Sequence, residues 1–220
     1  MATRQLLVEL VADCKKLSDV NISIESVGGV DAVKRVQAGE AFDLVILASD
    51  AIDKLIASGH IDPTSKVNLV NSGVAVAVRA GSAAPDISSE AAVKAAVLAA
   101  ETISYSTGPS GVALAKLFER WGISEQIASR IVQAPPGVPV GSLVAKGEVE
   151  LGFQQLSELI HLDGISIVGP LPPEIQITTT FSAGVCTASM QADEVKSMLA
   201  YMASPAATAA KLRQGMEMIE

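Results

Sequence analysis

Short apolar runs alternate with amphipathic segments along nearly the whole chain, and this alternation constrains the fold more than any other feature. Leu44–Ala48 is a continuous apolar run, typical of a strand buried on both faces, and a helical segment that ends at Gly59 follows it. Helical spacing also marks residues 3–17, and two long β-rich runs cover residues 67–78 and 175–186. Strands that alternate with helices at short intervals predict an α/β fold with mostly parallel sheets flanked by helices.

The remaining predicted elements are short. The strands are expected at residues 21–26, 102–106, 130–132, 151–154 and 164–168, and the helices at 32–39, 88–100, 110–121, 140–145, 157–161 and 194–213. The composition changes near Ala80 and again at the Pro-rich segment around Pro172, each time beside a long β-rich run. These runs are expected to be crossover segments between two lobes. The first lobe would then comprise residues 1–79 and 173–220, and the second residues 80–172.

The composition excludes several classes of partner. The net charge is −8, the basic residues are scattered singly, and aromatic residues make up only 3% of the chain, so nucleic acid is not an expected partner. No apolar run is long enough to span a membrane, and the first residues read as a helix start and not as a signal peptide. The pattern favours buried thiols over a disulfide for Cys14 and Cys186, and neither they nor the distant His60 and His161 suggest a metal or a cofactor.

The residues that carry chemistry lie at helix starts. Gly28-Gly29-Val30, the segment Ser106–Gly111 and the segment Pro135–Gly141 each place a Gly- or Ser-bearing turn between a strand and a helix, and Thr3 heads the first helix. Helix N-termini offer unpaired N–H groups and the positive end of a dipole, so several that converge form an anion site. Each one alone is more often an ordinary cap or turn, and only several together indicate a site.

A few side chains are candidates to join such a site. Arg4, at the head of the first helix, is placed either to form a surface salt bridge or to meet a ligand carboxylate. Glu158 follows Gln154-Gln155 and is either a cleft residue or a carboxylate at a helix start.

Four segments carry a resemblance to a known family. They are Gln37–Ser49, Pro109-Ser110-Gly111, Lys146–Gln155, and the closing Ser204–Ala207 with Gly215-Met216. In this order and spacing, the chain resembles the molybdate-binding-protein-like family of bacterial ABC-transporter substrate-binding proteins. The resemblance implies a two-lobed periplasmic-binding-protein type II fold, a periplasmic location, a small anionic ligand, and an ABC-transporter permease as a partner.

The resemblance also implies site residues. By position, the oxyanion-binding turns of the family fall on Thr3, on Gly29 with Val30, on Ser110, and on Gly137 with Val138, and Ser49 closes the first matching segment. Gln155 stands where the family has a cleft tyrosine, and Gly28-Gly29 replace a Ser-rich turn. Because amide side chains and Gly N–H groups suit a carboxylate as well as an oxyanion, the ligand class stays open. The family also begins with a strand before the first helix, so we expect the true start to lie upstream of Met1.

Three functions fit these observations. The leading hypothesis is a solute-binding protein whose lobes hinge shut around one small anion without catalysis. The alternative is an isomerase, because some relatives of the family look like aconitate isomerases. Glu158 would then be the base, with Arg4, Gln154 and Gln155 as carboxylate partners. The third, an effector-binding domain of a regulator, is disfavoured because the chain has no helix-turn-helix segment.

Overall fold

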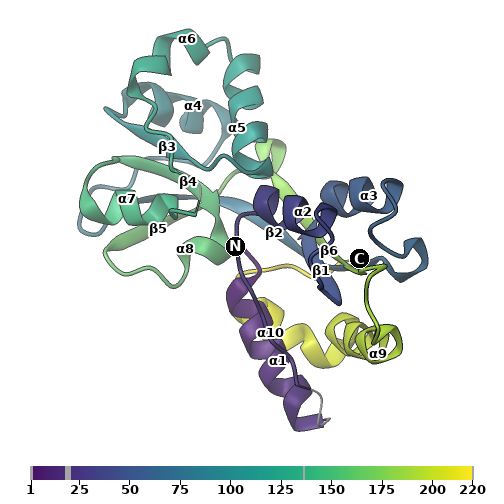
Figure 1. Cartoon of the computed structure of the whole chain (residues 1–220). Coiled ribbons are helices and arrows are strands. Elements are labelled where there is room, and N and C mark those ends of the chain that lie inside the picture. Colours follow the sequence, from purple (N-terminus) through teal and green to yellow (C-terminus); the bar gives the residue numbers. More distant parts are fainter. Residues whose placement is uncertain (1, 18–20, 136, 220) are drawn as a thin grey trace. The chain divides into compact units, whose positions relative to one another are not determined.

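The computed structural model describes residues 2–17, 21–135 and 137–219, and the chain packs as two compact units (Figure 1). Unit 1 is Met1–Ser72 with Thr179–Glu220, and unit 2 is Gly73–Thr178. The chain therefore passes between the units twice, once within β2 (Val67–Arg79) and once at the start of β6 (Thr178–Val185). The lobe boundaries expected from the sequence, 79/80 and 172/173, stay a prediction.

Unit 1 is built on β1 (Leu44–Ala48), β6 and the first part of β2. β1 pairs antiparallel with β6, with Ile46 opposite Ala183, and β6 lies beside β2. The helices of this unit are α1 (Arg4–Leu17), α2 (Gly29–Gln37), α3 (Ser49–Ala57), α9 (Ala192–Ala203) and α10 (Thr208–Arg213), with short 3₁₀ turns η1 (Pro63–Ser65) and η4 (Pro205–Ala207).

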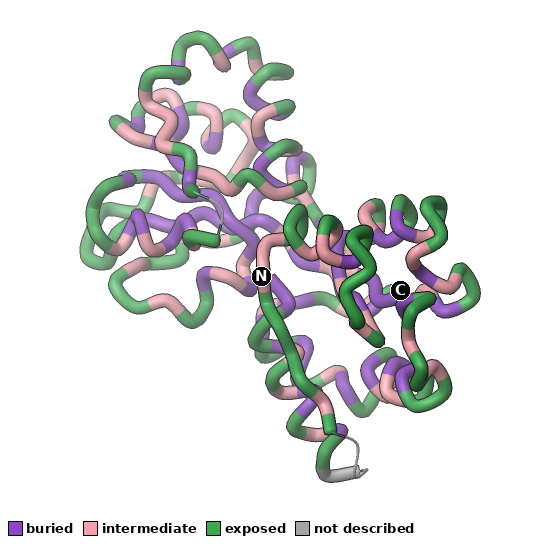
Figure 2. Tube along the Cα trace, viewed as in Figure 1, coloured by how far each residue is buried: buried purple, intermediate pink, exposed green. Residues whose placement is uncertain are grey.

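Alternation along β1 divides the core of unit 1 into two layers. Val45 and Leu47 pack with residues of α2 and α3, whereas Leu44 and Ile46 face a second cluster formed by α1, β2, β6, α9 and α10. Successive side chains of a strand point to opposite faces, so a single five-residue strand serves both layers. Figure 2 shows the buried residues following the strands of each unit.

Unit 2 is built on the rest of β2 with β3 (Ile103–Tyr105), β4 (Leu151–Gln155) and β5 (Ile165–Pro170). β3 and β4 are parallel, whereas β4 and β5 each pair antiparallel with β2. The helices are α4 (Glu90–Ala99), α5 (Pro109–Arg120), α6 (Ser124–Ile127), α7 (Val140–Lys146) and α8 (Leu156–Leu159), with 3₁₀ turns η2 (Ala128–Arg130) and η3 (Pro173–Ile175).

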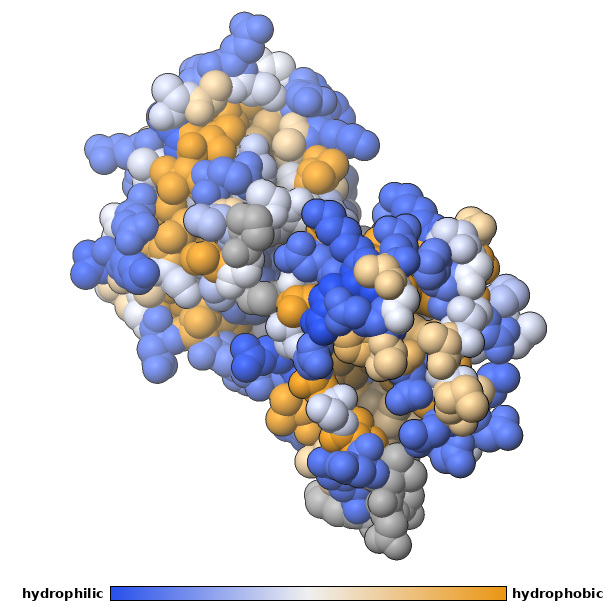
Figure 3. Space-filling model, in the orientation of Figure 1, coloured by the Kyte–Doolittle hydropathy of each residue, from blue (hydrophilic) through white to orange (hydrophobic). Residues whose placement is uncertain are grey.

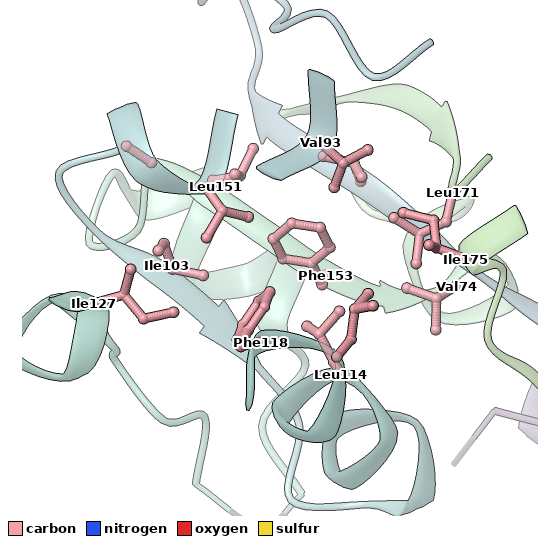
Figure 4. Packing of buried hydrophobic residues seen from close by; sticks show 14 of the residues in the cluster. Val74, Val93, Ile103, Leu114, Phe118, Ile127, Leu151, Phe153, Leu171 and Ile175 are labelled. Atoms are coloured by element: carbon pink, nitrogen blue, oxygen red, sulfur yellow. The ribbon is translucent and has the colours of Figure 1, made fainter. Parts of the chain in front are cut away.

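The two faces of β4 carry different packing. Phe153 lies in a cluster with Val93 of α4 and Phe118 of α5, and the Phe118 and Phe153 rings meet edge to face with centroids 6.2 Å apart (Figure 4). On the opposite face, a Cβ added to Gly152 would lie 2.6 Å from the Val144 side chain, so this glycine lets α7 approach the strand closely. Helices α4 and α5 thus cover one face, and α7 covers the other (Figure 1).

The α/β class is confirmed, but the described strand pairs are mixed and not mostly parallel. The reason is that both crossover segments pair antiparallel with their neighbours: β6 with β1, and β2 with β4 and β5. A parallel neighbour requires a crossover connection, and β3 and β4 have one through α5.

Three predicted elements are wrong. Residues 21–26 form no helix or strand, and although Ile22 packs against the core of unit 1, Ile24 is 37% exposed, so their alternation does not mark a strand with a buried face. The strand at residues 130–132 is a single bridge between Ile131 and Ile103. The helix at residues 194–213 is interrupted at Ser204, whose backbone is extended because Pro205 follows it, and the Ser204 side chain accepts a hydrogen bond from the Ala206 N–H.

The remaining predictions concern single residues and the surface. Cys14 and Cys186 are buried and form no disulfide in the described part of the chain, which confirms the predicted thiols, and burial raises the pKa of Cys186 to about 11. Hydrophilic side chains cover most of the face in Figure 3, with smaller hydrophobic patches between them. None of the helices described is long and apolar enough to cross a membrane.

Candidate functional site

Two helix starts of unit 1 meet at the end of β1. Helix α2 begins after Gly28, and its first N–H groups precede the helical bond from Ala32 N to Gly28 O (2.9 Å). Helix α3 begins at Ser49, directly after β1. A Cβ added to Gly29 would lie 3.8 Å from Leu47 Cδ2, which places the start of α2 beside the end of β1. Neither helix has a side-chain cap, so its first N–H groups are left for another acceptor.

The glycines before α2 are not required by the backbone. Gly28 has φ −59° and ψ 144°, and Gly29 is not among the residues with positive φ. A Cβ at either position would meet its nearest neighbour no closer than 3.6 Å, an ordinary contact. Alanine would therefore fit at both positions, and what glycine adds is an uncovered backbone that another molecule can approach.

The start of α1 carries two predicted site residues, Thr3 and Arg4. Thr3 is buried and its carbonyl accepts a hydrogen bond from Leu7 N (2.9 Å), whereas Arg4 is exposed. Over the described ranges, no hydrogen bond joins Thr3 or Arg4 to Gly28–Val30 or to Ser49. Their assignment to a ligand site remains a prediction.

In unit 2, α5 begins with a tightly folded turn. Ser110 is buried in its first turn, and the Gly108 N–H donates to Ser106 Oγ (3.3 Å). A Cβ added to Gly111 would lie 1.7 Å from the Ser106 carbonyl oxygen, so only glycine permits this approach. The N–H groups of Ser110 and Gly111 precede the first helical bond, from Val112 N to Gly108 O (3.0 Å), and no side chain caps them.

Gln155 lies on the sheet face that α5 covers. It is directly opposite Val74 in β2, and Val74 belongs to the same buried cluster as Leu114 of α5. Gln155 is only 4% exposed, and its Oε1 has no hydrogen-bond partner in the described part of the chain. Leaving a buried polar group unpaired costs about 1–3 kcal/mol, and among the described residues none donates a hydrogen bond to this amide oxygen.

Gln154, the neighbour of Gln155, points to the opposite face. Its Oε1 accepts a hydrogen bond from Gly141 N at 3.3 Å, and its Nε2 donates to Glu158 Oε2. Burial raises the pKa of Glu158, and the hydrogen bond from Gln154 opposes part of that rise. The structure therefore joins Gln154 and Glu158, two of the predicted residues, to the start of α7.

The turn before α7 uses its backbone N–H groups in hydrogen bonds within the protein. The N–H of Val138 donates to Pro135 O at 3.0 Å, and Gly137 has a positive φ of 81°. Since the Gly141 N–H is also taken, α7 has fewer donors for an anion than α5. The role of Gly137 and Val138 in ligand binding stays a prediction.

Two residues near these groups were not predicted. Tyr105 ends β3 with its ring edge-on to Phe118 (centroids 5.9 Å apart), and burial raises its pKa. Ser104 Oγ is the other buried side-chain atom without a partner among the described residues. A tyrosine at the carboxyl end of a parallel strand is a signal in the sequence for a ligand site, because ligands bind at that end of the sheet. Nothing in the sequence indicates that the Ser104 hydroxyl is buried without a partner. No group of three His, Cys, Asp or Glu side chains in the described ranges could hold a metal ion.

Comparison with known proteins shows the family. Residues 1–217 match the model of a family described as bacterial extracellular solute-binding protein. The chain belongs to this family. The family is extracellular by its description.

Solved structures with the same fold include molybdate-binding proteins. The periplasmic molybdate-binding protein of Azotobacter vinelandii has a TM-score of 0.81 and 20% identity, over 99% of this chain and 96% of that one. A substrate-binding domain attributed to a molybdenum ABC transporter of Clostridium difficile has a TM-score of 0.78 and 16% identity, over 100% and 96%. This solute-binding protein therefore has the two-lobed type II periplasmic-binding-protein fold, as predicted.

A curated relative has a different name. An aconitate isomerase from a Pseudomonas species is 39% identical over 171 residues, which cover 77% of this chain. The matched part spans 65% of the length of that relative.

Proposed function

We propose that this solute-binding protein binds a small organic anion through a carboxylate group. The observation that carries the proposal is the uncapped start of α5, where the Ser110 and Gly111 N–H groups precede the first helical hydrogen bond. These N–H groups and the Ser110 hydroxyl would bind the carboxylate in unit 2. The unpaired Gln155 Oε1 is an acceptor, so it would take a hydrogen bond from a ligand hydroxyl or a bound water. The starts of α2 and α3 would supply the donors of unit 1.

The surroundings favour an organic anion over an inorganic oxyanion. Val30 at the start of α2 is 65% exposed and Val112 in the first turn of α5 is 53% exposed. Each places an aliphatic side chain next to free N–H donors, which suits a ligand that has methylene groups between its carboxylates. An oxyanion such as molybdate has no apolar part that these side chains could cover.

A thermal-shift screen tests the ligand class. At a concentration of about 100 times Kd, a ligand adds about 2.7 kcal/mol of stability, which raises Tm by about 5–11 °C for a chain of this size. We expect this rise with citrate, cis-aconitate or trans-aconitate, and none with molybdate, tungstate or sulfate. Gln155→Met should reduce it, because the Gln155 Oε1 acceptor is lost, whereas Gln126→Met on the exposed side of α6 is the matched control. A rise with oxyanions alone would contradict the proposed class, and no rise with any anion would contradict anion binding.

The two units would close around the ligand. The chain passes between them only within β2 and at the start of β6, and two such crossings permit hinge bending. The closed form would then be presented to an ABC-transporter permease, with the protein in the periplasm. Small-angle X-ray scattering with and without a stabilising ligand tests the closure, and an unchanged radius of gyration would contradict it.

Isomerisation of aconitate is the second candidate. The identity with the aconitate isomerase favours it, and so does the buried Glu158 carboxyl, whose raised pKa suits a general base. The reaction removes one proton from the methylene carbon of the substrate, moves the double bond by one position, and returns one proton to the former vinylic carbon. Atoms and charge balance without a cofactor.

A direct assay tests this candidate. The protein is incubated with trans-aconitate in D₂O, and proton NMR follows cis-aconitate and deuterium at the methylene carbon. Both should appear with the wild-type protein and not with Glu158→Gln. If the protein is stabilised by trans-aconitate but forms no cis-aconitate, it is a binding protein only.

A further inference from the structure

Gln154 uses both ends of its amide inside the protein. Its Oε1 accepts the Gly141 N–H at 3.3 Å, and its Nε2 donates to Glu158 Oε2. Gln154 is buried, and it is opposite Ala75, which packs with Leu159 of α8. Its amide orientation is therefore set by an N–H donor on one side and a carboxylate acceptor on the other.

The packing around this network leaves little room for another arrangement. A Cβ added to Gly141 would lie 2.6 Å from Leu162 Cδ1 and 2.9 Å from Leu159 Cδ2. The start of α7 thus lies directly against α8 and the residues after it, which holds the Gly141 N–H and Glu158 on either side of Gln154. Gln154 Nε2 donates to Glu158 Oε2, so this contact leaves Oε1 as the carboxylate oxygen that can meet a ligand.

We propose that Gln154 is a positioning residue, which holds Glu158 Oε2 so that Oε1 is the atom that takes a proton from the ligand and returns it. This inference rests on the second candidate function. It assigns the two adjacent glutamines different roles: Gln155 contacts the ligand, and Gln154 acts only through Glu158. In the proton transfer, Oε1 gains the proton as the carbon–hydrogen bond breaks, and loses it as the new one forms.

Titration of Glu158 tests the positioning without any activity assay. The carboxyl carbon of Glu158 is followed by ¹³C NMR against pH in glutamate-labelled protein, and it is assigned from the signal that Glu158→Gln loses. In Gln154→Met the ionised carboxylate loses a donor, so its pKa should rise by about one pH unit. Gln154→Glu, which keeps an acceptor for Gly141, should raise it as well. Gln133→Met is the control, because Gln133 Nε2 donates to the Tyr105 carbonyl at 2.8 Å.

Kinetics with trans-aconitate test the role in proton transfer. We expect Gln154→Met to lower kcat about tenfold with little change in KM, and Glu158→Gln to lower it about 10²- to 10⁴-fold. A Glu158 pKa that is unchanged in both Gln154 variants overturns the positioning. If the Glu158 pKa shifts in the Gln154 variants but the wild-type protein does not isomerise aconitate, the proton transfer is overturned and the positioning stands.

Discussion

Two glycines at helix starts should respond in opposite ways to alanine, since only one is required by packing. In Gly111→Ala the new Cβ would lie 1.7 Å from the Ser106 carbonyl oxygen, so the turn before α5 or the helix itself must shift. Overpacking of this kind costs about 1–3 kcal/mol, and contact with a backbone atom places it at about 3 kcal/mol. The expected fall in Tm is about 6–12 °C.

Gly29→Ala is the matched comparison. Its Cβ would meet only Leu47 Cδ2, at 3.8 Å, and its backbone is not in the left-handed region. Alanine lowers the entropy of the unfolded chain, so a gain of about 0.4–1 kcal/mol and a slightly higher Tm are expected. If the ligand approaches this backbone, the added methyl group should weaken its binding about tenfold.

The assay combines stability with binding. Trp121, the single tryptophan, directly follows α5 in unit 2, so its fluorescence during urea unfolding reports on Gly111→Ala. Circular dichroism follows Gly29→Ala, and calorimetric titration measures ligand affinity for both. An unchanged Tm in Gly111→Ala, or an equal loss of Tm in Gly29→Ala, would refute the distinction between the two glycines. Unaltered affinity in Gly29→Ala would remove this backbone from the site.

Three further changes test individual contacts. Gln176→Ala should cost about 1–3 kcal/mol in urea unfolding, because Gln176 Oε1 accepts the N–H groups of Val74 (3.1 Å) and Ile177 (2.8 Å). Ser89→Ala should cost about 1 kcal/mol, because the Ser89 side chain caps α4; Ser88→Ala is its control. Glu158→Gln should change the pH dependence of Tm. Burial raises the pKa of Glu158 above its ordinary 4.5, so its contribution to stability is present below that pH and is lost as pH rises through the raised pKa. The wild-type protein should therefore lose stability over that range relative to the variant, and equal profiles would contradict the burial effect.

The sequence predicts correctly those elements whose burial can be read from their own residues. Leu44–Ala48 is a strand with apolar side chains on both faces, and that pattern is visible without knowing its partners. The pairing direction is not visible in the same way. β1 pairs with β6, with Leu44 opposite Val185, and no local feature of either segment specifies an antiparallel partner so distant in the chain.

The wrong predictions arise where a pattern lacks its partner or continues past a stop. Ile22 and Ile24 alternate with polar residues, but none of the described strands pairs with them. Apolar spacing continues from Val195 into α10, yet Pro205 has no N–H to donate and forces Ser204 out of the helical conformation. In that case the signal was present in the sequence, and the apolar pattern was given too much weight.

The candidate site shows the same limit at the scale of single residues. Gln154 and Gln155 are adjacent and identical in chemistry, so the sequence assigned both to the ligand. In β4 they point to opposite faces, and one has both ends of its amide engaged while the other has an unpaired oxygen. Likewise, the N–H groups of Val138 and Gly141 are taken, whereas those of Ser110 and Gly111 precede the first helical bond of α5. An anion bound to unit 2 would therefore find its donors at the start of α5, and the start of α7 would act on it only through Gln154 and Glu158.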